Sequence, residues 1–386
     1  MTKNFIFAVA TLMGAIVGLG IFGIPYTAAK AGFFVGVFHI IALGIVMLFL
    51  HLIYGEIVER GKERHRLTGD VEKYFGKIWK KILGITIIFS IYAALLAYII
   101  VGGKFLALLL SDLGTPFVLS IFFWFMLSAI VWWGIKTIAE VELLMTGLMA
   151  LIILVLFAWG VGDVSPKNLY GFNLSNIFLP YGVTLFAFSG IFAIPEIREL
   201  LKFPSGADRH AVADGKYYKR AIIWGSVIPI FVYLLFTILV VGISGHNTSE
   251  ESLSGLVPYL GVGVARLGAI FGILAIATSY IALASNLKRT FEYDWRIRPR
   301  ISASFVIFAP IILFIGGMQQ FIEIISFSGA VLGAIIGIFI ILIYQRAVKF
   351  GDRKPGYALN VPSPVRFGLI TLLALGGVYE IIYLLT

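Results

Sequence analysis

Long apolar runs divide this chain, and each has about the 20 residues that an α-helix needs to cross the hydrocarbon of a bilayer. With 60% hydrophobic and 13% charged residues, the 386-residue chain is far from the composition of soluble domains. A transmembrane β-barrel would instead show short segments of alternating hydropathy. The pattern therefore predicts an all-α polytopic membrane protein. Its eleven expected transmembrane helices are approximately 5–27, 32–57, 81–110, 116–134, 139–161, 176–200, 219–243, 262–287, 301–317, 321–344 and 365–385.

Lysine and arginine lie mostly on one side of the predicted membrane. If the N-terminus is in the cytoplasm, 26 of the 30 fall in cytoplasmic segments, as the positive-inside rule requires. Anionic lipid of the inner leaflet then accounts for the net charge of +10 without a nucleic-acid partner. We expect a multi-pass protein of the cell membrane with its N-terminus cytoplasmic and its C-terminus outside. The absence of cysteine excludes disulfides and thiolate chemistry.

Two nearly identical phrases interrupt the predicted first and sixth helices, GIFGIP at Gly20–Pro25 and GIFAIP at Gly190–Pro195. Glycine lets the backbone leave a helix, and proline lacks the amide that would extend one. We therefore predict that helices 1 and 6 are discontinuous, with freed backbone groups that face protein or a water-filled cavity. The alternative is that small residues such as Gly14 and Gly18 only allow close packing and that the prolines only kink the helices.

The two phrases occupy the same position in two consecutive sets of five helices. Because five is odd, the second set is inverted relative to the first, a pattern typical of secondary transporters with a site at the bilayer midplane. We expect one transmembrane domain over residues 1–386. Its repeats would span about 5–161 and 176–344, followed by an extra helix at about 365–385.

A pair of broken helices suits a zwitterion. The N-terminus of a half-helix carries partial positive charge and free amides, and the C-terminus carries the opposite. We expect the carboxylate of an amino acid to bind amides of Gly18–Gly20. The ammonium would bind carbonyls near Ala15 and in Phe186–Ser189. No charged side chain is needed, and no cofactor is expected.

Three segments resemble a known superfamily. MGAIVGLGIFGIPYTAAKAGFF (Met13–Phe34), YAALLAYIIVGGKFL (Tyr92–Leu106) and LFAFSGIFAIPEI (Leu185–Ile197) are similar to the first, third and sixth helices of amino acid–polyamine–organocation transporters. The likeness is greatest to the amino acid/auxin permeases and the hydroxy and aromatic amino acid permeases. It implies a five-plus-five inverted repeat, alternating access and cation-coupled amino acid uptake.

The eighth helix, AIATSYIALASNLK, is similar to that of the neurotransmitter:sodium symporters, which share this fold. The resemblance implies a Na⁺ site formed by the carbonyl of Ala275, the hydroxyls of Thr278 and Ser279, and the carbonyls of Gly14 and Val17. The alternative is that the two hydroxyls bond carbonyls of their own helix, as is usual for Ser and Thr in membrane helices.

Proton coupling is the other alternative. Proton-coupled relatives often carry a lysine in the fifth helix, but residues 138–160 have none and Met149 is near the expected place, which favours Na⁺. An ionisable residue in a membrane helix is a functional candidate, so Glu196, His39 and Glu323 remain possible proton carriers. Their structural roles would be a helix cap, a packing residue and a solvated helix start.

The outer gate of the sodium symporters uses a basic residue before the proline of the first helix, where this chain has Ile24. Tyr98 with Phe188 or Phe192 would have to close the site instead. Phenylalanines without charged neighbours flank the second break, which predicts a neutral, apolar or aromatic side chain on the substrate. The predicted substrate-binding residues are Ala15, Gly18, Leu19, Gly20, Tyr98, Phe186, Phe188, Ser189 and Phe192.

Three other classes of protein are alternatives: a membrane enzyme, a channel, and a structural or receptor protein that would bind substrate without transporting it. A membrane enzyme would require clustered Asp and His or paired carboxylates in the membrane interface. The acidic pairs here sit at predicted inner helix ends beside Lys or Arg, so no enzyme is expected. A channel would conduct without saturating in substrate. The prediction is a secondary active transporter that imports an amino acid with a cation, Na⁺ being favoured.

Overall fold

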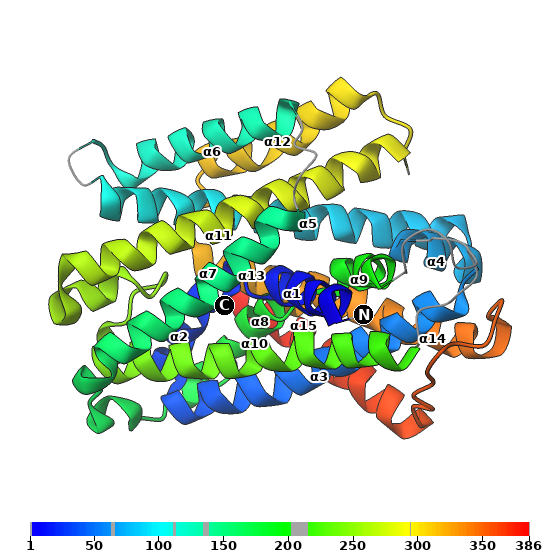
Figure 1. Ribbon diagram of the computed structural model, residues 1–386, viewed down its shortest axis with the longest axis horizontal. Helices are drawn as coiled ribbons and strands as arrows, with labels where there is room; N and C mark the ends of the chain where they lie inside the picture. The colour runs from blue at the N-terminus through cyan, green and yellow to red at the C-terminus, as the bar shows by residue number, and fades with distance from the viewer. Residues whose placement is uncertain are drawn as a thin grey trace.

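Helices account for all the regular elements in the residues that the computed structural model describes, 2–62, 66–110, 113–133, 139–201, 215–293 and 295–385 (Figure 1). The helices are α1 (Thr2–Ile16), α2 (Gly20–Ala31), α3 (Phe33–Arg60), α4 (Leu67–Phe75), α5 (Lys77–Leu109), α6 (Pro116–Trp133), α7 (Ala139–Gly160), α8 (Leu179–Ala187), α9 (Ile194–Leu200), α10 (Gly215–Ser244), α11 (Val257–Tyr293), α12 (Pro299–Ile315), α13 (Phe321–Phe327), α14 (Gly333–Phe350) and α15 (Ser363–Leu385). A 3₁₀ turn at Ile191–Ala193 precedes α9, and a π-helical turn at Ser328–Leu332 joins α13 to α14.

Within the described residues, eight helices are long and apolar enough to cross a membrane. The pair Asn4–Ile16 and Gly20–Ala31, bent by 51°, gives a ninth candidate span, and Leu151–Asp163 and Pro299–Ile315 are shorter apolar helices. All of them coincide with predicted membrane helices. The protein is therefore a multi-pass, all-helical membrane protein, while the count of eleven spans and the inverted repeat stay predictions.

Two helices are broken near the middle of the molecule. Val17–Leu19 separates α1 from α2, and Phe188–Gly190 separates α8 from the 3₁₀ turn that leads into α9. Pro195 occupies the first turn of α9, as expected of a residue that begins a helix. Pro25 instead lies inside α2, so the first break precedes Gly20 and does not involve the proline. Figure 1 shows α1, α8 and α9 between α5 and α11 on one side and α3 and α10 on the other.

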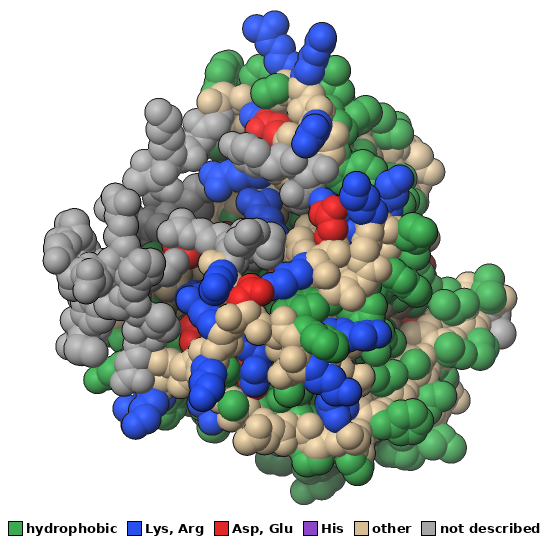
Figure 2. All heavy atoms as spheres, turned by 90° about the vertical axis from the view of Figure 1, so that its right-hand side faces the viewer, with side chains coloured by type: hydrophobic (Ala, Val, Ile, Leu, Met, Phe, Trp, Pro, Cys, Tyr) green, Lys and Arg blue, Asp and Glu red, His purple; other side chains and the backbone are tan. Residues whose placement is uncertain are grey.

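Basic side chains gather on one face of the molecule, which Figure 2 shows and which we call the basic face. It lies at the end of the molecule where α4, α9 and the start of α1 are found (Figure 1). Lys73 of α4 forms an ion pair of 2.6 Å with Asp352 in the loop after α14. The hydrogen bond from Lys73 holds the pKa of Asp352 below its usual range, so this link stays charged at neutral pH.

Helix α4 lies in a polar stretch where no helix was predicted. It begins after Arg66 and ends at Gly76, whose φ of 91° suits only glycine well. The side chain of Met149, which bears on the choice of coupling ion, lies outside the described residues.

Candidate functional site

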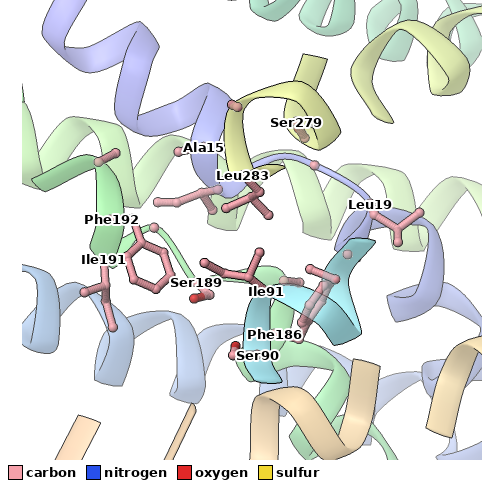
Figure 3. Close-up of a pocket in the computed structure, with 18 of the residues that line it drawn as sticks. Ala15, Leu19, Ser90, Ile91, Phe186, Ser189, Ile191, Phe192, Ser279 and Leu283 are labelled. Atoms are coloured by element: carbon pink, nitrogen blue, oxygen red, sulfur yellow. The ribbon is translucent and has the colours of Figure 1, made fainter. Parts of the chain in front are cut away.

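A cavity of about 160 Å³ lies where the two broken helices meet (Figure 3). Its walls come from both halves of each broken helix and from α5, α11 and the π-helical turn. Eight of the nine predicted substrate residues and all five predicted ion ligands line this cavity. They are Gly14, Ala15, Val17, Gly18, Leu19, Gly20, Tyr98, Phe186, Ser189, Phe192, Ala275, Thr278 and Ser279. The structure thus brings together residues that lie up to 265 positions apart in the sequence.

The first break frees backbone groups on both sides. The amide of Gly18 donates to Ile16 O at 2.9 Å and not to Gly14 O, its partner in a continuous helix. Among the described residues, the corresponding helical bonds from Leu19 to Ala15 and from Ile21 to Val17 are also absent. The amides of Leu19 and Ile21 and three carbonyls have therefore lost their helical partners. A buried amide or carbonyl without a partner is costly, so these groups require a ligand or water.

The second break also changes the backbone hydrogen bonds. The amide of Ser189 donates to Phe186 O at 3.1 Å, which leaves Leu185 O without its helical partner. The Gly190 amide donates to Nε2 of His51, on α3, at 3.3 Å. Nδ1 of the same ring lies 3.0 Å from Ser226 Oγ, on α10. This arrangement assigns the proton of His51 to Nδ1 and makes the neutral ring a fixed support for the break. The role of His51 could not be predicted from the sequence, because its partner Gly190 is 139 residues away.

Tyr233, on α10, connects the two breaks directly. Its hydroxyl lies 2.8 Å from Ile16 O and 2.8 Å from Ala187 O, so it serves the last residue of α1 and the last residue of α8 at once. The side chain is fully buried. A buried tyrosine hydroxyl requires a hydrogen-bond partner. A tyrosine within an apolar helix therefore predicts such a partner from the sequence. That prediction could not say which carbonyls Tyr233 would reach.

Hydroxyl groups from α5 and α11 face the first break. A Cβ atom on Gly18 would lie 3.4 Å from Ser279 Oγ and 3.6 Å from the Tyr98 hydroxyl oxygen. Oγ1 of Thr278 lies 3.2 Å from Leu274 O and 3.0 Å from Ala275 O and donates to these carbonyls. Bonding within its own helix is the alternative to a Na⁺ ligand given above. The lone pairs of Oγ1 remain available to a cation.

Phe188 does not line the cavity, which is a correction to the predicted site. Its ring is buried and packs on Tyr233 with 4.9 Å between ring centroids, and it also faces Gly44 of α3. The reason is its place at the C-terminal end of α8, where the chain turns and directs this side chain to the back of the helix. Phe186 and Phe192 lie on the cavity side (Figure 3).

The cavity is closed at the end away from the basic face. Phe22 of α2 is buried there and meets Phe105, Phe236 and Phe271 with ring centroids 4.9, 5.9 and 6.4 Å apart. Ser252, in the loop after α10, donates to Phe22 O at 2.6 Å. This aromatic cluster and the loop cover the start of α2.

The cavity residues nearer the basic face are accessible. Ala15, Ser189 and Glu196 are exposed and line the cavity. Helix α9, which carries Glu196, is anchored to α3 by Arg198, whose Nε lies 3.2 Å from Glu59 Oε1 and whose NH1 donates to Val58 O at 2.7 Å. The described state is therefore open towards the basic face and closed on the other side.

The three candidate proton carriers have different positions. Glu196 is in the first turn of α9 at the cavity, where a carboxylate is favoured by the helix dipole. Nδ1 of His39 lies 2.9 Å from Val35 O of its own helix, away from the cavity. Glu323 is exposed in the first turn of α13. Only the first of these three is placed where a proton could accompany a substrate.

Comparison with known proteins gives the family. Residues 1–382 match the model of the tryptophan/tyrosine permease family. The chain belongs to this family. Members of the family are transport proteins, so the chain is an amino acid transporter and not an enzyme.

Two curated relatives match most of the chain. The tyrosine-specific transport system 1 of Haemophilus influenzae is 23% identical over 326 residues, which cover 78% of this chain and 77% of that protein. The tryptophan-specific transport protein of Shigella flexneri is 22% identical over 355 residues, which cover 83% and 81%.

Two solved structures share the fold. MhsT, in a crystal structure with L-phenylalanine, aligns with a TM-score of 0.69 over 100% of this chain and 98% of that chain, at 16% identity. Mhp1, a nucleobase-cation-symport-1 family transporter in a closed conformation with bromovinylhydantoin, aligns with a TM-score of 0.64. The alignment covers 87% of this chain and 77% of that chain, at 15% identity. At these identities the likeness establishes the fold of the permease and leaves its substrate and ion to be argued from its own residues.

Proposed function

We propose that this permease imports an aromatic amino acid, tryptophan or tyrosine, by alternating access in symport with a cation, Na⁺ being favoured. The observation that carries the proposal is the pair of broken helices around one cavity, with free amides at one break and free carbonyls at both. The family and the names of its relatives support an aromatic substrate.

In this account the carboxylate of the substrate accepts hydrogen bonds from the amides of Leu19 and Ile21, where α2 begins. The Gly18 amide, also expected to bind the carboxylate, already donates to Ile16 O at 2.9 Å. The ammonium donates to carbonyls at Ala15 and Leu185–Ser189, and the side chain lies against Phe186 and Phe192 with Tyr98 near the backbone of the substrate. Preformed partners of this kind bind without the cost of reorganising the site. The ring then occupies the apolar part of the cavity.

Na⁺, as a co-transported substrate, would bind the carbonyls of Gly14, Val17 and Ala275 and the hydroxyls of Thr278 and Ser279. Neutral oxygens are suitable ligands for a hard monovalent cation. The loss of the helical partners of Gly14 O and Val17 O supports this assignment. Alternating access requires that the aromatic cluster around Phe22 opens when the cavity closes at its end towards the basic face. The same account places the basic face and the N-terminus in the cytoplasm, and treats residues 5–161 and 176–344 as inverted repeats with 365–385 as an additional helix.

The test is uptake of labelled L-tryptophan and L-tyrosine into proteoliposomes at fixed pH, with an inward gradient of Na⁺ or of K⁺. We expect accumulation only with Na⁺, and loss of the Na⁺ stimulation in Thr278→Val with Ser279→Ala, because both hydroxyl ligands are removed. Ser304→Ala is the control, since its hydroxyl bonds its own helix at Arg300 O, 3.0 Å away, and does not line the cavity. Equal Na⁺ stimulation in the double variant would contradict the ion site. Accumulation driven by a proton gradient alone would favour proton coupling through Glu196. This residue is the second candidate for cation coupling because it lines the cavity.

A further inference from the structure

Ser90 and Ser328 form a hydroxyl pair in the cavity wall away from the helix breaks. Ser90 is on α5, Ser328 begins the π-helical turn, and their Oγ atoms are 3.3 Å apart. Both residues line the cavity, Ser90 partly exposed to it and Ser328 buried with 2% of its surface accessible. The roles proposed above for the carboxylate, the ammonium and Na⁺ do not use this pair.

The surroundings of the pair are apolar. Ile91 and Ala94 of α5 and Phe186 of α8 line the same cavity. Figure 3 shows Ser90 across the cavity from Ala15, with Ile91 and Ser189 between them in this view and Phe186 to one side. An amino acid that places its charged groups at the breaks therefore extends its side chain through the apolar part of the cavity towards Ser90.

The position of Ser328 is fixed by close packing. A Cβ atom on the next residue, Gly329, would overlap Gly182 O and the Phe186 amide of α8. The π-helical turn is thus in direct backbone contact with the broken sixth helix. Inserted π-turns of this kind are frequent at functional sites. Ser328 consequently holds Ser90 at a defined place relative to the substrate cavity.

The pair has unused hydrogen-bonding capacity. Two hydroxyls offer two donors and four lone pairs, and their mutual bond uses one of each. Ser90 can therefore accept a hydrogen bond from a ligand or donate one to it. The phenol hydroxyl of tyrosine can do both, the indole N–H of tryptophan can donate, and the ring of phenylalanine can do neither.

We propose that Ser90 is a specificity-determining residue that binds the polar atom on the substrate ring, the phenol oxygen of tyrosine or the indole nitrogen of tryptophan. Ser328 is the positioning residue that orients the Ser90 hydroxyl. The proposal rests on the proposed transport of aromatic amino acids and adds to it a rule for choosing among them. A site built to bond a polar atom rejects an analogue without it, since its own group is then left unpaired. One neutral hydrogen bond gives about tenfold discrimination.

The experiment measures competition against uptake of labelled L-tyrosine or L-tryptophan, the proposed substrates, in proteoliposomes. The first pair of unlabelled ligands is L-tyrosine and L-phenylalanine. The second is L-tryptophan and 3-benzothienyl-L-alanine, in which sulfur replaces the indole N–H. In the wild type, the half-inhibitory concentration should be about tenfold lower for the member of each pair with the polar ring atom. In Ser90→Ala the ratio should fall to about one, and in Ser328→Ala to an intermediate value. The ratio is independent of how much active protein is present.

Thr86→Val is the matched control, because Thr86 is one turn before Ser90 on α5 and its hydroxyl donates to Ile82 O of its own helix at 3.0 Å. This variant should keep the wild-type ratio. An unchanged ratio in Ser90→Ala would overturn the proposal. Equal inhibition by the two members of each pair in the wild type would overturn the proposal even if a variant fails to insert. Absence of any uptake or inhibition by aromatic amino acids would instead contradict the proposed function itself.

Discussion

Replacing Gly20 by leucine is expected to reduce uptake at least a hundredfold without preventing insertion of the protein into the membrane. A Cβ atom at this position would overlap the backbone of Ala187, the last residue of α8. The beginning of α2 and the end of α8 can approach each other only because residue 20 has no side chain. A larger residue must push the two breaks apart. Displacements of about 1 Å in a positioned site can cost a hundredfold in rate.

The measurement is uptake per amount of monodisperse, inserted protein. Gly20→Ala should already show much of the loss, because one methyl group is enough to meet Ala187. Gly368→Leu is the control, since Gly368 lies inside α15 with open space where its Cβ would be. If Gly20→Leu transported at the wild-type rate, the close contact between the two breaks would not be needed for transport.

Tyr233→Phe is expected to lower uptake about a hundredfold. The hydroxyl of Tyr233 lies 2.8 Å from both Ile16 O and Ala187 O and has one proton to share between them. Phenylalanine removes this donor from a buried place, where Ile16 O keeps the Gly18 amide but Ala187 O loses this partner. Each unsatisfied buried group costs about 1–3 kcal/mol, and about 1.4 kcal/mol corresponds to a factor of ten. The ring itself still packs on Phe188, so the change isolates the link between the two broken helices.

Tyr92→Phe is the matched control for this link. It also removes a hydroxyl that donates to a backbone carbonyl, Phe305 O at 3.1 Å, but the bond joins α5 to α12 away from the cavity. We expect at most a small change in uptake for this variant. Equal losses in the two variants would show that Tyr233 contributes to general stability and not to the geometry of the breaks.

The sequence predicted those parts of the site that depend on the backbone and on local pattern. The phrases at Gly20–Pro25 and Gly190–Pro195 located both breaks to within a few residues, although each break lies at or before the start of its phrase and Pro25 is inside α2. A break in lipid must face protein or a cavity. The candidate ligands at Gly14, Val17 and Ala275 came from a resemblance, and the structure places all three around one cavity. Their roles as ligands remain to be tested.

The parts that the sequence did not predict depend on contacts between distant residues. Tyr233 and His51 look like ordinary residues of membrane helices, and only the packing of α3 and α10 against the breaks gives them partners. Phe188 was assigned to the cavity because it is next to the break. The direction of its side chain just after the end of α8, where the ring packs on Tyr233, cannot be derived from proximity in sequence.

The central claim, that an aromatic amino acid binds between the two breaks, is tested most directly by protection of a single cysteine. The chain has no cysteine, so Ser189→Cys, at an exposed position in the cavity, can be labelled alone with a maleimide. Ser363→Cys, exposed at the start of α15, is the control outside the cavity. The account predicts that L-tryptophan or L-tyrosine at ten times its half-saturating concentration slows labelling of residue 189 about tenfold by mass action, with no change at residue 363. An unchanged labelling rate in a Ser189→Cys protein that still takes up these amino acids would contradict the account.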